Sequence, residues 1–126
     1  MNYVLDASAL LAFFQGEPGS ETVENALESA SISAVNWAEV VQKAVANGVE
    51  VTGMREELEA LGVLIVPFDQ GQAEATGLLW SKKRRYGLSL GDRACLCLGR
   101  EHKATIFTAD RAWEKLDLGV KIHVIR

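Results

Sequence analysis

The sequence contains few of the residues that mark several common protein classes. Its 126 residues include only 2 cysteines, 2 histidines and 2 prolines, too few for a disulfide framework or a structural zinc site. No apolar run approaches the roughly 18 residues of a membrane-spanning helix, and no basic segment of a signal peptide opens the chain. Walker A, Gly-x-Gly-x-x-Gly and Gly-x-Ser-x-Gly motifs are missing, so nucleotide cofactors and serine hydrolases have no support. We therefore expect a soluble, cytoplasmic protein.

The overall composition is that of one globular domain, which we expect to span residues 1–126. Hydrophobic residues make up 48% and charged residues 24% of the chain, as in ordinary folded domains. Charge is unevenly distributed: residues 1–60 hold ten acidic and two basic residues, whereas residues 61–126 hold seven acidic and eleven basic ones. The basic run at residues 82–85 is compatible with nucleic-acid binding. From charge alone, the simpler interpretation of this run is the solvated carboxyl end of a helix, where basic residues are favourable.

Short apolar segments alternate with longer segments of helical periodicity. Strands are predicted at residues 3–5, 31–33, 63–66, 105–107 and 121–125. Helices are predicted at residues 7–14, 20–30, 35–46, 52–61, 70–86 and 90–101, with a helical turn at 111–115. Because most of these strands lack polar alternation, both faces of the sheet should be buried. The pattern predicts an α/β protein, a three-layer α/β/α sandwich with a short, mainly parallel sheet and right-handed crossovers.

Four acidic residues occupy the positions where such a fold places its chemistry. Asp6 directly follows the first strand, and Asp110 follows the fourth after two residues. Glu39 lies early in the helix after the second strand, and Asp92 lies in the first turn of the helix that begins at residue 90. Because sites in parallel sheets lie beyond the carboxyl ends of the strands, all four are candidates for one edge of the sheet.

The same acids have a simpler explanation as helix caps. Asp6 and Asp110 each precede a helical segment. Asn36-Trp37-Ala38-Glu39 resembles a capping box with Asn36 in the cap position, and Ser89-Leu90-Gly91-Asp92 fits the capping signature directly. For any one acid alone, capping is the better interpretation.

The set of four favours a metal site instead. Glu39 and Asp92 adjoin apolar helix faces, where a free carboxylate is unfavourable unless it is paired. Carboxylates gathered at one edge would also raise each other's pKa values. Mg²⁺ or Mn²⁺, which prefer carboxylate and water oxygens, would resolve this conflict. A cation so bound can activate water and stabilise charge on a phosphodiester.

Four segments carrying these acids resemble a known family when they are read in order. Residues 3–12, 32–40, 88–94 and 105–113 are similar to the acid-bearing segments of the PIN-domain family. Within that family the chain resembles the VapC-type toxins of toxin–antitoxin pairs, and the resemblance covers essentially the whole chain.

The resemblance implies a Mg²⁺- or Mn²⁺-dependent endoribonuclease with a PIN-like fold. It implies a homodimer and an antitoxin partner whose carboxyl-terminal segment crosses the active site, with DNA contacted only through the antitoxin. The implied metal-binding and catalytic quartet is Asp6, Glu39, Asp92 and Asp110. The implied supporting polar residues are Ser8, Asn36 and Thr108. Candidate contacts to the RNA backbone are Lys82, Lys83, Arg84, Arg85 and Arg93.

Two other functional classes stay open on the sequence alone. One is a catalytically idle module that keeps the fold and binds RNA or protein. The other is a receiver-like phosphoacceptor domain, which has a similar length and an acidic Mg²⁺ pocket. Receiver domains usually carry adjacent acids after the first strand, whereas Asp6 is followed by Ala7. Cys95 and Cys97 are interpreted as small core residues.

Overall fold

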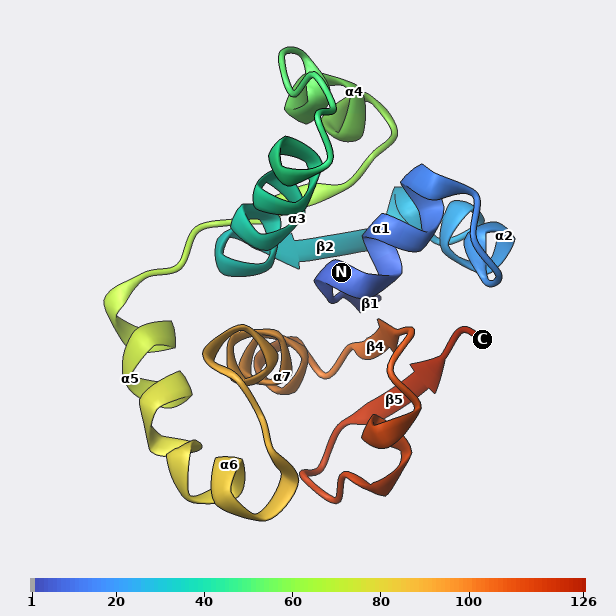
Figure 1. Ribbon diagram of the computed structural model, residues 1–126. Coiled ribbons are helices and arrows are strands. Elements are labelled where there is room, and N and C mark those ends of the chain that lie inside the picture. The colour runs from blue at the N-terminus through green and yellow to red at the C-terminus, as the bar shows by residue number, and fades with distance from the viewer. Residues whose placement is uncertain (1) are drawn as a thin grey trace.

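A computed structural model describes residues 2–126, without the side chains of residues 82–84. Its centre is a five-stranded sheet in the order β3-β2-β1-β4-β5, and every neighbouring pair of strands is parallel (Figure 1). The predicted α/β class with a parallel sheet is thus confirmed. The strands are β1 (Tyr3–Leu5), β2 (Ala30–Ser33), β3 (Leu64–Val66), β4 (Thr105–Thr108) and β5 (Lys121–Val124).

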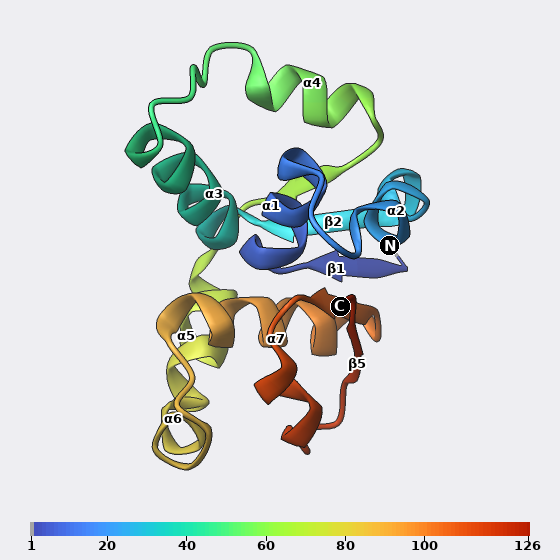
Figure 2. The same cartoon turned by 45° about the vertical axis from the view of Figure 1, so that its right-hand side comes forward.

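Helices cover both faces of the sheet (Figures 1 and 2). The α-helices are α1 (Ala7–Gln15), α2 (Ser20–Glu24), α3 (Ala34–Ala46), α4 (Met54–Ala60), α5 (Gln70–Leu78), α6 (Trp80–Tyr86) and α7 (Leu90–His102). Two short 3₁₀ helices are η1 (Leu27–Ser29) and η2 (Arg111–Lys115). Within residues 2–126, no helix is both long and apolar enough to cross a membrane.

Neighbouring residues of β1 belong to two separate hydrophobic clusters. Leu5 packs with Ile32 and Phe107 on the side of α1 to α4. Val4 packs with Ile106 and with apolar residues of α7 on the opposite side. Val4 and Leu5 are both fully buried, as expected for a parallel strand covered on both faces.

The predicted helix over residues 20–30 is wrong in its second half. Helix α2 ends at Glu24, a 3₁₀ turn follows, and Ala30 already belongs to β2. Ala30 pairs with Tyr3 of β1. The chain must therefore become extended there, and sheet pairing overrides the local helical periodicity.

The predicted helix over residues 70–86 is divided at Leu79 into α5 and α6. Leu79 is buried beside Leu88, and Tyr86 also packs against this cluster. This cluster also contains apolar residues of α7. The break thus occurs where the chain packs against distant residues, and the local sequence does not signal it.

Candidate active site

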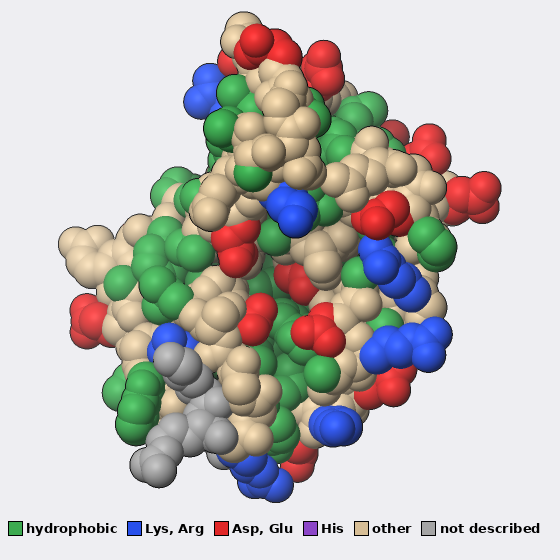
Figure 3. All heavy atoms as spheres, in the orientation of Figure 1, with side chains coloured by type: hydrophobic (Ala, Val, Ile, Leu, Met, Phe, Trp, Pro, Cys, Tyr) green, Lys and Arg blue, Asp and Glu red, His purple; other side chains and the backbone are tan. Residues whose placement is uncertain are grey.

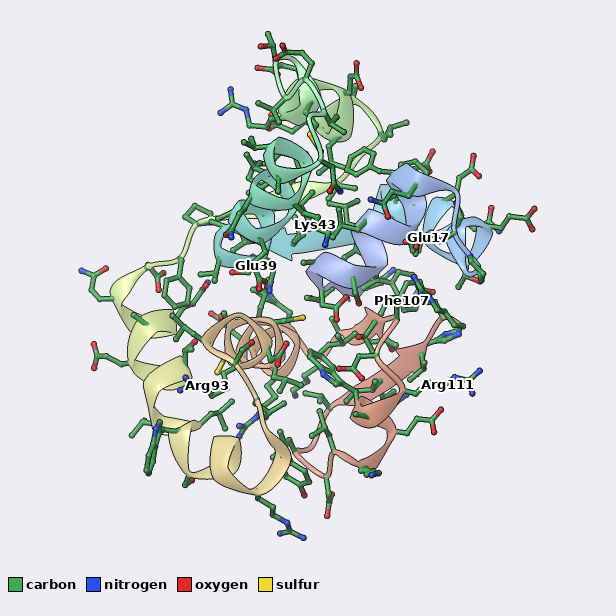
Figure 4. The ribbon with its side chains drawn as sticks, viewed as in Figure 1. Glu17, Glu39, Lys43, Arg93, Phe107 and Arg111 are labelled. Atoms are coloured by element: carbon green, nitrogen blue, oxygen red, sulfur yellow. The ribbon has the colours of Figure 1, made fainter. Side chains whose placement is uncertain are left out.

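The four predicted acids come from elements that meet at the carboxyl edge of the sheet. Asp6 follows β1, Asp110 lies beyond β4, Glu39 is on α3 after β2, and Asp92 is in the first turn of α7. Figure 3 shows acidic side chains around a hollow near the centre of this face, and Figure 4 places Glu39 beside it.

Asp6 is the buried member, with 6% of its surface exposed. Its Oδ1 accepts hydrogen bonds from the Ala9 amide at 2.8 Å and the Ser8 hydroxyl at 2.7 Å. Its Oδ2 accepts one from the Thr108 hydroxyl at 2.5 Å. An ionised carboxylate has about four acceptor positions, so one on Oδ2 is left. Asp6 therefore caps α1, as the simpler interpretation predicted, and still has an oxygen available to a ligand.

Thr108 connects Asp6 with Asp110. The Thr108 hydroxyl accepts a hydrogen bond from the Asp110 amide at 3.1 Å while it donates to Asp6. One carboxylate oxygen of Asp110 accepts from the Ala112 amide at 2.9 Å, which caps η2. Ser8 closes the group, because its hydroxyl accepts from the Ala109 amide at 2.9 Å. The structure therefore brings the predicted supporting residues Ser8 and Thr108 into direct contact with Asp6.

Asn36 holds Glu39 from inside α3. Its buried amide donates to Glu39 Oε1 at 2.8 Å and to the Gly91 carbonyl at 3.0 Å. The interpretation of Asn36 as a helix cap is wrong, because Ser33 caps α3. The expectation that Glu39 is unfavourably placed against an apolar face is also wrong, because its side chain is exposed. Asn36 instead fixes the Glu39 carboxylate against the start of α7.

Asp92 is fixed by the predicted capping box. The Ser89 amide donates to Asp92 Oδ2 at 2.9 Å, and the Asp92 amide donates to the Ser89 hydroxyl at 3.1 Å. Glu39, Asp92 and Asp110 thus share one feature: each is held through one carboxylate oxygen, and the other has no hydrogen-bond partner among the described residues. Asp92 and Asp110 therefore each combine a capping role with an unpaired carboxylate oxygen.

The charges of three of these carboxylates act on the thiol of Cys95, a fully buried residue of α7. The pKa of its thiol is raised well above the ordinary value, first by burial and then by the charges of Asp6, Asp92 and Glu39. The pKa of Asp6 is itself raised to about 6, chiefly by burial and slightly by Asp92, although its three hydrogen bonds oppose the shift. Cys95 and Cys97 are both buried and free, which confirms their interpretation as core residues.

The donor set fits a hard divalent cation that retains water. Among the described residues, no three side chains of His, Cys, Asp or Glu form a ready cluster of metal ligands. Mg²⁺ does not require one, since it usually binds through one or two carboxylates and keeps several waters. Asp6 and Asp92, coupled through their charges, supply carboxylate oxygens of that kind. A cation there would relieve the unfavourable charge of buried Asp6.

The predicted RNA contacts divide into three groups. The side chains of Lys82, Lys83 and Arg84 lie outside the described residues. Arg85 is exposed, and its guanidinium lies 5.2 Å from the centre of the Tyr86 ring. Arg93 is placed differently from both.

Arg93 is buried between α5 and α7, with 7% of its surface exposed (Figure 4). Its guanidinium donates to the Thr76 carbonyl at 3.2 Å and to the Ser89 carbonyl at 3.3 Å. No carboxylate within the described part of the chain forms an ion pair with it. This geometry favours a structural role: Arg93 fastens the turn that carries Asp92 to α5.

Replacing Arg93 with Ala should lower the free energy of unfolding by about 2–3 kcal/mol, because two charge-assisted hydrogen bonds are lost, one to the buried Thr76 carbonyl and one to the partly buried Ser89 carbonyl. Urea unfolding followed by circular dichroism measures this. Arg100→Ala is the matched control, since Arg100 is exposed on the same helix and should change stability by no more than about 0.5 kcal/mol. Equal stability of the two variants would contradict the structural role.

Sequence reasoning missed two participants in this arrangement. Gly91 accepts a hydrogen bond from Asn36 and lies against the Glu39 carboxylate. A glycine inside a helical pattern often marks such a close approach, and that signal was available. Thr76 offers its carbonyl to Arg93, and nothing in the local sequence indicates this pairing.

The fold and these side chains define a class: a parallel α/β protein with a group of carboxylates at the carboxyl edge of its sheet. A model of the PIN domain family matches residues 3–118, and the chain belongs to that family. PIN domains are generally nucleases and typically use divalent metals. No curated protein sequence matches the chain significantly.

Solved structures share the fold over nearly the whole chain. A toxin–antitoxin complex from Klebsiella pneumoniae is 21% identical with a TM-score of 0.77, covering 99% of this chain and 98% of that one. DNA-bound VapBC from Salmonella typhimurium is 18% identical with a TM-score of 0.72, covering 98% and 97%. VapBC2 from Rickettsia felis, bound to a promoter fragment, is 17% identical with a TM-score of 0.69, covering 98% of each chain.

Proposed function

We propose that this protein is a Mg²⁺- or Mn²⁺-dependent endoribonuclease and the toxin of a VapBC-type toxin–antitoxin pair. The observation that supports the proposal is the group of carboxylates at this edge of the sheet. Glu39, Asp92 and Asp110 are each held through one oxygen and keep the other unpaired, and Asp6 keeps one acceptor position on Oδ2. A PIN-family chain with this donor set suits phosphodiester hydrolysis without a protein nucleophile. In this proposal the whole chain acts as one cytoplasmic domain.

Asp6 and Asp92 would hold the cation, with Asp110 and Glu39 binding it directly or through water. When bound, the cation supplies an activated water and neutralises charge on the phosphodiester. The Ser8 and Thr108 hydroxyls and the Ala9 amide keep Asp6 in one orientation. Asn36 does the same for Glu39. In-line hydrolysis would leave 5′-phosphate and 3′-hydroxyl ends.

Basic side chains beside the site would hold the RNA backbone. Lys43 lies one turn after Glu39 on α3, at the rim of the acidic hollow (Figures 3 and 4). The exposed side chain of Arg85 is a second proposed phosphate contact, and the sequence adds Lys82, Lys83 and Arg84 as further candidates. Phosphate contacts from such residues position the strand without reading its sequence.

An antitoxin and a second copy of the chain are the proposed protein partners. A pocket of about 250 Å³ between α1, α3 and α4 is lined by apolar side chains that include Leu11, Phe14 and Met54, with Glu50 and Glu57 beside them. It suits an apolar segment that also carries positive charge. The similar folds are those of toxin–antitoxin complexes, some bound to DNA, and any DNA binding here would pass through the antitoxin.

Cleavage of total cellular RNA by the purified chain tests the nuclease. Discrete cuts are expected with Mg²⁺ or Mn²⁺ and none with EDTA, and the new ends should carry 5′-phosphates. Cuts that persist in EDTA, or that leave cyclic phosphates, would contradict the proposal. If no RNA is cut while Mg²⁺ still binds, as followed by calorimetry, the idle binding module is the better interpretation.

A further inference from the structure

A second pocket lies at the amino ends of the strands, away from the acids. It has a volume of about 460 Å³, within the roughly 300–1,000 Å³ typical of small-ligand sites. One wall is the sheet face formed by β1, β4 and β5, and the other is the end of α2 with the residues after it. Its lining consists of Tyr3, Thr22, Asn25, Ala26, Thr105, Phe107 and His123.

Three rings form the sheet wall. The Tyr3 and Phe107 ring centres are 4.9 Å apart with a 35° tilt, and those of Phe107 and His123 are 5.0 Å apart at 73°. Phe107 is buried and points into the space between α2 and the strands (Figure 4), whereas Tyr3 is half-buried and His123 exposed. The row therefore has a packed centre and two accessible rings.

Polar groups surround these rings without partners. The side chains of Thr22, Asn25, Thr105 and His123 make no hydrogen bond to another side chain or to the backbone within the described residues. An asparagine amide both donates and accepts. The pocket thus combines aromatic faces with donors and acceptors that are free to bind a ligand.

Positive charge lies on the same face of the edge strand. Thr105 pairs with Lys121, and Phe107 pairs with His123. Because side chains alternate along a strand, Lys121 and His123 both point to the pocket side of β5. Lys121 is exposed, so its ammonium can meet an anionic group attached to a ring in the pocket.

We propose that this pocket binds one nucleobase of the RNA strand. The identity of this ligand rests on the proposed function. The base would lie across this row of rings, stacked on the exposed ring of His123 and with its far edge toward the ring of Tyr3, as bases lie on aromatic platforms of single-strand binding proteins. Asn25 would contact its edge, and Lys121 the adjoining phosphate. Tyr3 is three residues from Asp6 along β1, about 10 Å, so a short strand can reach both sites.

The chain contains only two histidines and two tyrosines, which gives the experiment internal controls. The ring resonances of His123 and Tyr3 are followed by NMR in the presence of EDTA, so that no divalent cation contributes to the binding. Adenosine and cytidine are titrated separately, and ribose 5-phosphate serves as the ligand without a base. Nucleosides should shift Tyr3 and His123, while His102 on α7 and Tyr86 on α6 stay in place. Ribose 5-phosphate, which can meet only Lys121, should shift the two pocket rings much less than either nucleoside.

Variants test the stacking itself. His123→Ala should weaken nucleoside binding at least about five-fold, and His123→Tyr should restore it. His102→Ala is the matched control and should bind like the parent chain. Unmoved Tyr3 and His123 rings at saturating nucleoside, or shifts caused equally by ribose 5-phosphate, would overturn the proposal. RNA cleavage without nucleoside shifts rejects the pocket alone, whereas nucleoside shifts without cleavage reject the nuclease alone.

Discussion

Replacing Asp6 with Asn is expected to lower metal-dependent RNA cleavage at least about 100-fold, because the carboxylate that would bind the cation is lost and such binding contributes several kcal/mol to the transition state. The same substitution should stabilise the metal-free protein. Catalysis and stability therefore change in opposite directions at one residue. This combination separates loss of a ligand from loss of the fold.

The gain in stability follows from the burial of Asp6. Its pKa is raised from 3.8 to about 6, so the ionised form is less favourable in the folded chain than in the unfolded one. Above pH 6 this difference corresponds to about 3 kcal/mol of lost stability. An asparagine is neutral and keeps the same shape. Its oxygen can accept from Ala9 and Ser8, and its amide can donate to Thr108 once that hydroxyl rotates.

The pH dependence gives the effect a definite sign. Between pH 3.8 and about 6 the folded chain holds a proton on Asp6 that the unfolded chain has released. The contribution of Asp6 to the free energy of unfolding should therefore fall as pH rises through this range. Urea unfolding in EDTA at pH 5 and pH 7.5 measures it. The stability gained by the Asp6→Asn variant over the parent should be about half as large at pH 5 as at pH 7.5.

Mg²⁺ supplies the complementary measurement. A cation that binds only the folded state should raise the melting temperature of the parent chain as its concentration increases. It should have little effect on Asp6→Asn. Asp117→Asn, at an exposed acid outside the site, is the control and should respond like the parent. Full cleavage by Asp6→Asn, or equal stabilisation of both chains by Mg²⁺, would refute the role assigned to Asp6.

The sequence predicts those features of the fold and site that depend on residues close together in the chain, and it fails for those that depend on residues far apart. The acids after β1 and β4 and the Ser89–Asp92 capping box are local features, and parallel pairing brings them to one edge. The shortened helix α2 and the break at Leu79 depend on contacts with distant strands and helices. Arg93 follows the same rule: its charge suggested a phosphate contact, but its partners are carbonyl groups, one of them on another helix. The local sequence pattern therefore predicted where the acids lie in the fold better than it predicted the packing around them.

The substitution Gly91→Ala tests the packing between α7 and Glu39 without removing any functional group. A Cβ at this position would lie 2.6–2.7 Å from the three atoms of the Glu39 carboxylate group, so Glu39 must move in Gly91→Ala. Cleavage should fall about 10- to 100-fold, the usual effect of disturbing groups that orient metal ligands. Stability should hold or increase, since alanine is favoured over glycine in helices by about 1 kcal/mol, and the displaced atoms end a flexible side chain. Single-turnover cleavage and urea unfolding measure the two effects.

The control is Gly77→Ala, because Gly77 is also in a helix and a Cβ there meets no atom within 4 Å. It should gain similar stability and keep full activity. A double-mutant cycle with Glu39→Gln then identifies the route of the effect. If Gly91 acts by leaving room for Glu39, the double variant should be no slower than Glu39→Gln alone. Losses that multiply would show that Gly91 acts on α7 and Asp92 instead, and unchanged activity in Gly91→Ala would show that cleavage does not need Glu39 in this position.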